Sequence, residues 1–477
     1  MEDQKLEDRR LGGVQSRDGR HARVVDKFVD HGAPLSFGAL SLAIVPPTTR
    51  YLVLDLDRTT HLGRNLGELL GWELCAHLAY GPERLAELEA HRRGRFCFDW
   101  SHPWSLVRYL CLGIRLWAYA GLYYLAWGKI GARLDGLRRR AYRRFGTEPI
   151  REVQRVPQTA LFHQLSMLPL DTLRNLARNV WMRHRSDQVI EREDLEALRA
   201  RCPNLRIILS SASPTPMVEV AAEMLGADDF FASAIDEHDG YLSAPFGGHR
   251  LLKLEREPRR LSPPSKIHFN ASYAKIRRIV ERYPDFCDPE VIKVGMTDNG
   301  YGEDQCWTEF FNIVADLNSN TPFSPIVTPT SPLFEVHSAR VLTHAERATG
   351  RLDARRKLEE SKATARQLDD NALRARLGAV LAEIEDLASR YEASATSIAS
   401  ALARVKARTS ELRERIETQV RNYNEDHGPE RRAVLGRIRS ALSEELDLRR
   451  QIARIERPVS ELAYALTKQL EYARASL

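Results

Sequence analysis

The sequence is poor in cysteine and lacks the spacings that would put cysteine to use. Its 477 residues contain six cysteines, and no two of them form a CxxC pair. Neither a disulfide framework nor a zinc site is therefore indicated, and a reducing compartment is expected. Residues 1–50 mix charges of both signs and lack the basic start and apolar core of a secretory signal. Together these absences favour a cytoplasmic protein.

A strong charge bias and an uninterrupted apolar run are also missing. The net charge of +6 permits acidic partners but gives no reason to expect nucleic-acid binding. The most apolar stretch, residues 109–128, contains Arg115, which would cost about 2.5 to 3.5 kcal/mol near the middle of a membrane span. Buried helices explain the stretch at least as well. Peripheral membrane contact is a further expectation, because the basic segment 138–144 follows.

The spacing of apolar residues divides the chain into regions. Residues 1–47 are polar and are expected to form a flexible segment. Residues 63–186 carry apolar side chains at helical spacing, as in ELLGWELCAHLA, and are predicted to be mostly helical. Residues 187–320 alternate short apolar runs with helical stretches, which predicts parallel strands joined by crossover helices.

The remaining part of the chain divides into a proline-rich segment and a helical one. Residues 321–345 contain four prolines among Ser and Thr, and are interpreted as a linker or a strapped-down extended segment. Residues 346–477 show two apolar seams, Leu377 to Val420 and Leu435 to Leu470, separated by a break at 424–430. These seams predict an antiparallel coiled-coil hairpin. A homodimer is also expected, because a lone hairpin buries only one stripe of each helix.

Two carboxylates end an apolar run in the segment YLVLDLDRTT, residues 51–60. Residues 51–54 can form a buried parallel strand, which would put Asp55 and Asp57 at its carboxyl end, where open α/β sheets gather their sites. Carboxylates so close repel each other, and a bound cation would relieve that cost. Aspartates also start turns and cap helices, so this pair alone leaves both interpretations open.

Further segments follow in a recognisable order. RIILSSASPTP offers Ser211 at the end of another apolar run, HDGYLSA at 238–244 reads as a small hairpin, and YAKIRRIV carries Lys275, which precedes Asp298 by 298 − 275 = 23 residues. With DLDRT, these segments resemble the haloacid dehalogenase (HAD) superfamily and, within it, the phosphoserine-phosphatase-like branch. The resemblance covers roughly residues 48–62 and 187–320. It implies an α/β fold with a three-layer Rossmann-like HAD core and residues 63–186 inserted as a large helical cap.

The resemblance also assigns the motif residues. Asp55, Asp57 and Thr59 match the first motif, DxDxT, and Ser211 matches the second. Ser211 and Lys275 also have structural alternatives. The serines before Pro214 are a good helix start, and Lys275 could be only the solvated face of its helix.

The last acidic motif departs from the pattern of the branch. Met296 stands where the aspartate of a Gly-Asp pair would fall, and Asp298 follows two residues later. The second acid of this motif is left open between Glu303 and Asp304.

The residue types indicate a chemistry. Asp55 would attack phosphorus and form an aspartyl-phosphate, and Asp57 would serve as general acid and then general base. Mg²⁺ would be held by Asp55, the backbone carbonyl of Asp57 and Asp298. Ser211 would donate to a phosphoryl oxygen, and Lys275 would balance its charge. The leading hypothesis is a Mg²⁺-dependent phosphatase acting on a small phosphate monoester.

Two alternatives stand beside this hypothesis. In one, the helical hairpin assembles a scaffold around a catalytically degenerate HAD domain, and Met296 is its best support. In the other, the enzyme sits on membranes and hydrolyses a phospholipid head group.

Overall fold

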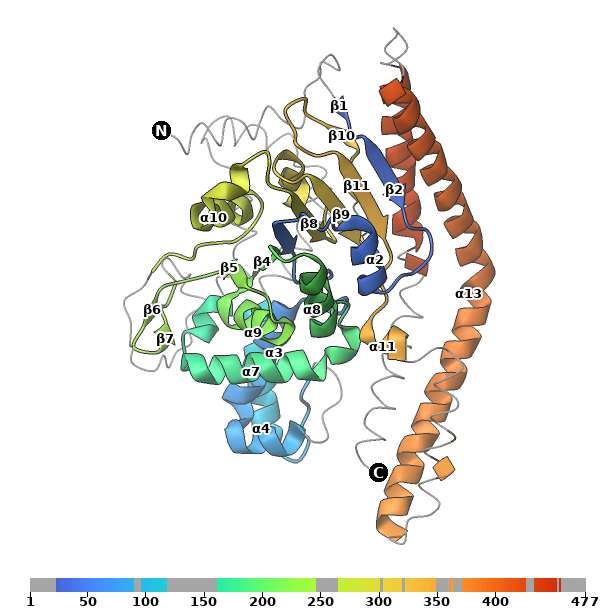
Figure 1. Cartoon of the computed structure of the whole chain (residues 1–477). Helices are drawn as coiled ribbons and strands as arrows, with labels where there is room; N and C mark the ends of the chain where they lie inside the picture. Colours follow the sequence, from blue (N-terminus) through green and yellow to red (C-terminus); the bar gives the residue numbers. More distant parts are fainter. Residues whose placement is uncertain are drawn as a thin grey trace, which may run out of the picture.

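The central feature is a seven-stranded sheet whose strands all run parallel, in the order β2-β11-β9-β8-β3-β4-β5 (Figure 1). The computed structural model describes residues 23–89, 96–117, 161–245, 265–300, 303–319, 322–348, 359, 362–363, 371–425, 433–452 and 454–455. The strands are β2 (Lys27–Asp30), β3 (Tyr51–Leu54), β4 (Arg206–Pro214), β5 (Asp229–Ser233), β8 (Lys293–Thr297), β9 (Ile313–Leu317) and β11 (Glu335–Ala339). The α/β class predicted from the sequence is confirmed.

Both faces of the sheet are covered, which explains why β3 is apolar at every position. Leu52 and Leu54 join one apolar cluster, whereas Tyr51 and Val53 join another on the opposite face. Successive side chains of a strand point to opposite faces, so a strand buried on both sides reads as a continuous apolar run.

Helices form the two outer layers. The cluster of Leu52 and Leu54 includes residues of α2 (Phe37–Ile44), α3 (Leu66–Tyr80), α7 (Leu170–Arg183), α8 (Arg192–Arg201) and α9 (Thr215–Leu225). The other cluster includes residues of α10 (Tyr273–Arg282), η4 (Pro284–Cys287), η5 (Glu303–Glu309), α13 (Asn371–Glu425) and a further helix over 433–452. The core is therefore a three-layer sandwich.

Small elements complete the described part. β1 (Arg23–Val24) pairs with β10 (Ile326–Val327), and β6 (Glu237–His238) pairs with β7 (Tyr241–Leu242), both antiparallel. Asp239 and Gly240 both have positive φ at the turn of the second pair, as a two-residue hairpin turn requires. The hairpin that HDGYLSA suggests is thus present. The helices α4 (Pro82–Glu89) and α11 (His344–Ala348) are short.

The structure differs from the expectation that residues 1–47 are flexible. From residue 23 the chain is ordered into β1, β2 and α2, and β2 forms an edge of the sheet beside β11. Phe37, Leu40 and Ile44 of α2 are buried in the core. β2 is short and only half apolar, and its partner lies about 300 residues away in the chain, so no local pattern marks it as a strand.

The interpretation of residues 321–345 as a linker is also corrected. β11 is an interior strand, parallel to β2 on one side and to β9 on the other. All four prolines precede it, at residues 322, 325, 329 and 332. A chain ending near Pro332 would lack this strand, so the α/β core is not complete at the proline-rich segment.

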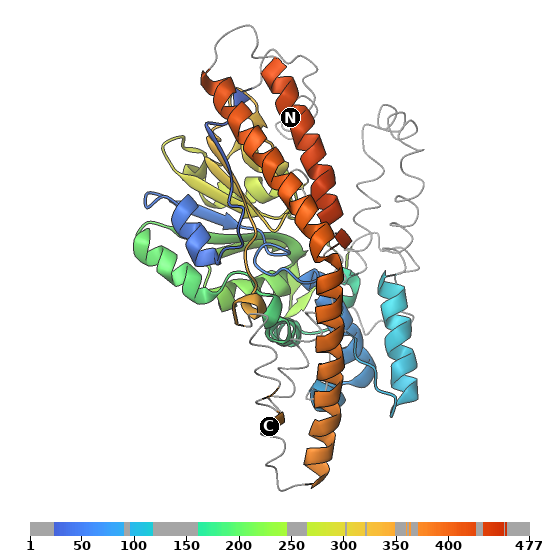
Figure 2. The same cartoon turned by 90° about the vertical axis from the view of Figure 1, so that its right-hand side faces the viewer.

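The C-terminal helices pack on the sheet instead of forming a separate tail. α13 ends at Glu425, near the predicted break, and the helix over 433–452 lies antiparallel beside it (Figure 2). Ion pairs of 3.0 Å and 3.4 Å join Glu444 to Arg408 and Arg415 across the pair. Leu412, Ile416, Val420, Val434, Leu435 and Ile438 belong to the same apolar cluster as Phe28 and Val336.

Part of the predicted hairpin stays untested. Leu462, Leu466 and Leu470 of the second seam lie outside the described residues. A coiled coil over the full length of both seams, and the homodimer expected from it, therefore remain predictions.

The apolar stretch at 109–128 is described only to Trp117. Residues 103–117 are helical, with Leu106, Tyr109, Leu112 and Leu116 buried and Trp104 and Ile114 exposed. Residues 118–128 and the basic segment 138–144 lie outside the described part. Within that part, no helix combines the length and the apolar character needed to cross a bilayer. Contact with a membrane surface stays a prediction.

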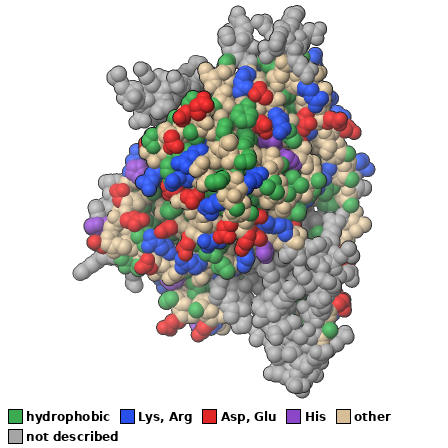
Figure 3. All heavy atoms as spheres, in the orientation of Figure 1, with side chains coloured by type: hydrophobic (Ala, Val, Ile, Leu, Met, Phe, Trp, Pro, Cys, Tyr) green, Lys and Arg blue, Asp and Glu red, His purple; other side chains and the backbone are tan. Residues whose placement is uncertain are grey.

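Charged side chains are mixed on the face of the molecule in Figure 3. Lys and Arg alternate there with Asp and Glu over the described residues. This face offers no wide basic patch of the kind that nucleic-acid binding uses.

Replacing Leu412 should show that α13 belongs to the folded core. Leu412 is 2% exposed, and Leu412→Ala is expected to lower the free energy of unfolding by about 2 to 5 kcal/mol, as buried leucine truncations do. Leu402→Ala on the same helix, outside both apolar clusters, is the matched control. Urea unfolding followed by circular dichroism measures both. Equal small losses in the two variants would mean that α13 does not contribute to the core.

Candidate active site

The carboxyl ends of β3, β4 and β8 bring the predicted site residues to one edge of the sheet. Asp55 directly follows β3, and its backbone N–H donates to the carbonyl of Met296 in β8 at 3.0 Å. Ser211 lies in β4, and Asp298 directly follows β8. β3 continues to β4 and β5 on one side, whereas β8 and β9 lie on its other side. This point of reversal is where open α/β sheets form their binding crevice.

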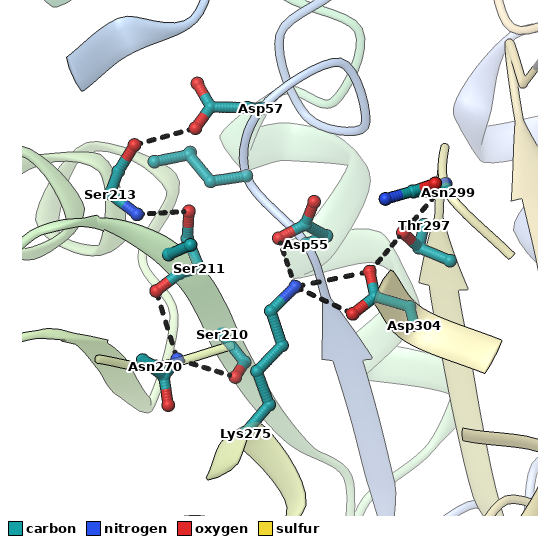
Figure 4. Close-up of polar contacts among 12 residues, drawn as sticks. Asp55, Asp57, Ser210, Ser211, Ser213, Asn270, Lys275, Thr297, Asn299 and Asp304 are labelled. Carbon is teal, nitrogen blue, oxygen red and sulfur yellow. Dashed lines mark hydrogen bonds and ion pairs between the residues drawn. The ribbon is translucent and has the colours of Figure 1, made fainter. Parts of the chain in front are cut away.

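Lys275 of α10 is the centre of the site (Figure 4). Its Nζ lies 3.0 Å from Asp55 Oδ1 and 2.9 Å and 3.2 Å from the two carboxylate oxygens of Asp304. The lysine is 2% exposed. A buried ammonium needs such partners, because it has three N–H donors and a high desolvation cost. The interpretation of Lys275 as a solvated helix face is therefore wrong.

Of the two candidates for the second acid of the last motif, Glu303 and Asp304, Asp304 contacts Lys275. Asp304 is buried and accepts a 2.6 Å hydrogen bond from Thr297 Oγ1 in addition to its contacts with Lys275. Glu303 is the first residue of η5, and its side chain lies outside what the structure describes. Thr297, at the end of β8, is a residue of the site that sequence reasoning missed.

Burial is the largest influence on the pKa of Asp55. Burial raises the pKa of the Asp55 carboxyl; Lys275 opposes this rise, and Asp304, Asp298 and Asp57 add to it. Burial likewise raises the pKa of Asp298 to about 7, although Arg58 acts in the opposite direction. Carboxylates that raise one another's pKa in this way favour the binding of a cation.

Asp57 contacts Ser213, whereas Asp55 contacts Lys275 (Figure 4). Ser213 Oγ donates to Asp57 Oδ2 at 2.7 Å, and the backbone N–H of Leu66, the first residue of α3, donates to Oδ1 at 2.7 Å. Burial raises the pKa of Asp57, and these two hydrogen bonds lower it. Arg58 has a φ of 63°, a left-handed conformation that turns the chain directly after Asp57.

The serines of β4 hold this loop instead of starting a helix. α9 follows Pro214 and has no side-chain cap, and Ser213 Oγ is directed to Asp57. Ser211 Oγ accepts from the backbone N–H of Ser213 at 3.1 Å. Sequence reasoning weighed Ser213 only as a helix cap, and its place beside Ser211 was the signal that it missed.

Asn270 is a second residue that sequence reasoning missed. It is fully buried, and its Nδ2 donates to Ser210 Oγ at 3.2 Å, to the Ser211 carbonyl at 3.0 Å and to the Phe231 carbonyl at 3.0 Å. These bonds fix the end of β4, where the pairing with β5 becomes irregular. The sequence gives no signal for them, because the three acceptors come from distant strands.

Two motif residues lie in the protein interior. Thr59 is fully buried, and its Oγ1 has no hydrogen-bond partner in the described part of the chain. Met296 is also fully buried and belongs to the apolar cluster of Leu52 and Leu54. Its side chain therefore packs in the core.

Two carboxylates of the site have the donor chemistry that Mg²⁺ takes from proteins. Among the described residues, no group of three or more His, Cys, Asp and Glu is placed to hold a metal. Mg²⁺ usually needs only one or two carboxylates and completes its shell with water and substrate phosphate. Asp55 and Asp298, at the ends of the paired strands β3 and β8, are two such carboxylates, and the charge of Asp298 raises the pKa of Asp55.

Comparison with known proteins gives structural similarity only. The sequence matches no protein-family model and no curated protein. The solved structures that the chain resembles include a HAD-family hydrolase and phosphoserine phosphatases.

The individual superpositions are loose. A HAD-family hydrolase from Salmonella enterica subsp. enterica serovar Typhi has a TM-score of 0.32 at 10% identity, covering 59% of this chain and 69% of that one. A phosphoserine phosphatase in apo form has a TM-score of 0.29 at 11% identity, covering 62% and 96%. A probable phosphoserine phosphatase from Vibrio cholerae has a TM-score of 0.29 at 10% identity, covering 64% and 65%. Function is therefore inferred from this chain's own side chains.

Replacing Lys275 by Met should destabilise the fold in a pH-dependent way. The variant leaves Asp55 and Asp304 buried without their cation, which is expected to cost about 3 to 5 kcal/mol of unfolding free energy at neutral pH. Loss of the cation raises the folded-state pKa of Asp55 further above its unfolded value. The deficit should therefore be largest at high pH and shrink as the pH falls through the raised pKa of Asp55, because the carboxyl then takes up a proton.

Chemical denaturation at several pH values measures this deficit. Lys266→Met, at an exposed position nearby in the chain, is the matched control and should show no such trend. A deficit that is the same at every pH would show that Lys275 acts through packing and not through its charge.

Proposed function

We propose that this protein is a Mg²⁺-dependent phosphatase of the HAD type, which hydrolyses a small phosphate monoester through an aspartyl-phosphate on Asp55. The observation that carries the proposal is the buried contact of Lys275 with both Asp55 and Asp304 at the carboxyl end of β3. This contact supports the proposal, because it brings the proposed nucleophile, a positive charge and a second carboxylate together.

Asp55 is the nucleophile in this proposal. A carboxylate oxygen attacks phosphorus in line, the P–O bond to the ester oxygen breaks, and the phosphoryl group passes to Asp55. The contact of Lys275 with Oδ1 orients the carboxylate and supplies positive charge beside the phosphoryl group. Ser211, at the end of the neighbouring strand, is the proposed hydroxyl partner of a phosphoryl oxygen.

Asp57 is the proton donor and acceptor. Its pKa is raised by burial, which suits a carboxyl that must hold a proton before the first step. It gives this proton to the departing ester oxygen and then takes one from the water that attacks the aspartyl-phosphate. The second attack releases phosphate and restores Asp55. Ser213 and the N–H of Leu66 hold the carboxyl in place.

The proposed ligands of Mg²⁺ are Asp55, Asp298 and the backbone carbonyl of Asp57. Bound there, Mg²⁺ would neutralise carboxylate and phosphoryl charge during the transfer. The crowding of carboxylates around Asp55 supports this assignment.

The scaffold alternative loses its main support. Met296 is a packed core residue, and its backbone carbonyl accepts the hydrogen bond that ties Asp55 to β8. The departure from the Gly-Asp pattern at this position therefore leaves the carboxylates of the site in place. A membrane-bound substrate stays an alternative, because Trp104 and Ile114 are exposed on the helix over 103–117; a small phosphorylated substrate is the proposal.

Replacing the nucleophile tests the reaction class. Asp55→Asn is expected to lower phosphate release from p-nitrophenyl phosphate roughly 10³-fold or more, because no aspartyl-phosphate can form. Omitting Mg²⁺ should abolish the wild-type activity. Asp171→Asn, a change at an exposed carboxylate in α7, is the control and should keep full activity. Substantial Mg²⁺-dependent turnover by Asp55→Asn would overturn the mechanism.

A further inference from the structure

One arginine of the C-terminal helix reaches the strand ends beside the active site. Arg449 lies in the helix over 433–452. Its Nη1 donates to the backbone carbonyl of Ser319 at 3.2 Å, its Nη2 donates to Ser338 Oγ at 2.9 Å, and its Nε donates to Glu445 Oε1 at 2.6 Å. Ser319 closely follows β9, and Ser338 belongs to β11. The guanidinium thus joins the helix to the ends of two strands.

Ser319 continues this contact to the candidate metal site. Its Oγ donates to the backbone carbonyl of Asp298 at 2.6 Å, and the residue is 6% exposed. Asp298 is one of the two carboxylates proposed to hold Mg²⁺. Two consecutive hydrogen-bonded residues, Arg449 and Ser319, therefore connect the C-terminal helix to the backbone of a proposed metal ligand.

The loop that follows Asp298 also packs against Asp316 and Phe323. A Cβ on Gly300 would lie 2.5 Å from Asp316 Oδ1 and 2.6 Å from the ring of Phe323, so the backbone passes directly over these groups. The Asp316 carboxyl accepts from the Phe323 N–H at 2.9 Å and 3.1 Å. Arg449 and Arg413 both act electrostatically on Asp316. Neither Asp316 nor Phe323 belongs to the catalytic motifs.

The arginines sit in a buried cluster of charges under the helix pair. Arg413 of α13 forms an ion pair with Glu445 and lies 3.8 Å from Asp30 Oδ2, and Arg449 lies 4.0 Å from the same oxygen. Arg413 and Glu445 are almost fully buried. Buried ion pairs repay their desolvation poorly, and apolar residues often replace them without loss of stability. A role in fixing geometry accounts for such a cluster better than stability does.

We propose that Arg449 is a positioning residue, which fixes the Asp298 loop through Ser319 and so makes the C-terminal helix pair part of the active enzyme. The inference rests on the proposed function, because it assigns the loop to Mg²⁺ binding. Residues that hold a metal ligand in place commonly affect metal affinity by 10- to 100-fold when they are removed. The helix pair should therefore influence Mg²⁺ binding although none of its own side chains is proposed as a ligand.

The test compares Mg²⁺ binding by four single variants of the full chain. Arg449→Met removes the guanidinium, and Ser319→Ala removes only the hydroxyl that reaches Asp298. Ser338→Ala removes the other strand contact of Arg449 but leaves the path to Asp298 intact. Arg450→Met changes the exposed neighbour of Arg449. Isothermal titration calorimetry with MgCl₂ gives the Kd of each protein, and circular dichroism checks its fold.

The expected result separates the two pairs of variants. Arg449→Met and Ser319→Ala should each raise the Mg²⁺ Kd about 10- to 100-fold, whereas Ser338→Ala and Arg450→Met should stay within about 2-fold. The double variant Arg449→Met/Ser319→Ala should be no worse than the more severe single variant, because both changes cut one path. If Arg449→Met does not fold, Ser319→Ala alone decides the question.

Two outcomes would contradict the inference, and they can be told apart. An unchanged Kd in folded Ser319→Ala would overturn the positioning role and leave the proposed phosphatase intact. A wild-type protein that binds no Mg²⁺ would overturn the proposed function, and this inference with it. Asp298→Ala is the reference for complete loss of a ligand.

Discussion

The buried ammonium of Lys275, held between Asp55 and Asp304, is the contact on which the rest of the site depends. It joins the end of β3 to α10, whose lysine lies 220 residues further along the chain, and to η5. Burial of these charges is tolerable only because they are paired, so the three elements must meet in one arrangement. The parallel sheet makes the meeting possible, since it aligns the carboxyl ends of β3 and β8 at one edge. Asp55, Lys275 and Asp304 are all buried as a result.

The C-terminal helices belong to the same folded core as the sheet. Two side chains of α13 form hydrogen bonds with the chain at the edge strand β2 and just before it. Asn424 Nδ2 donates to the Val25 carbonyl, and Glu417 accepts from the Asp30 N–H. Together with the helix over 433–452 it covers the second face beside α10 and η5. One continuous core therefore connects the helix pair, the strands β2, β11 and β9, and the loop that carries Asp298. A change in the helix pair can reach the site through short hydrogen bonds, without any large movement of the fold.

The sequence was informative where a pattern is local and less so where a partner is distant. The apolar run before Asp55, the position of Lys275 and the Ser211 segment are local patterns, and the fold brings their residues to one sheet edge as the resemblance implied. β2 and β11 were missed because they are short, half polar and paired across about 300 residues. The seam in α13 predicted a helix with an apolar stripe, but periodicity does not say whether the sheet or another helix covers that stripe. Ser213, Asn270 and Thr297 were missed because their roles depend on hydrogen bonds to other segments of the fold.

Chemical trapping of the covalent intermediate is the most direct test of the account. The enzyme would be mixed with Mg²⁺ and p-nitrophenyl phosphate, quenched, and treated with borohydride, which reduces an aspartyl-phosphate to homoserine. Peptide mass spectrometry then locates the modified residue. The account predicts homoserine at position 55 and at no other aspartate, and only when Mg²⁺ and substrate are both present. Modification of a different aspartate, or steady turnover with Asp55 unmodified, would contradict it.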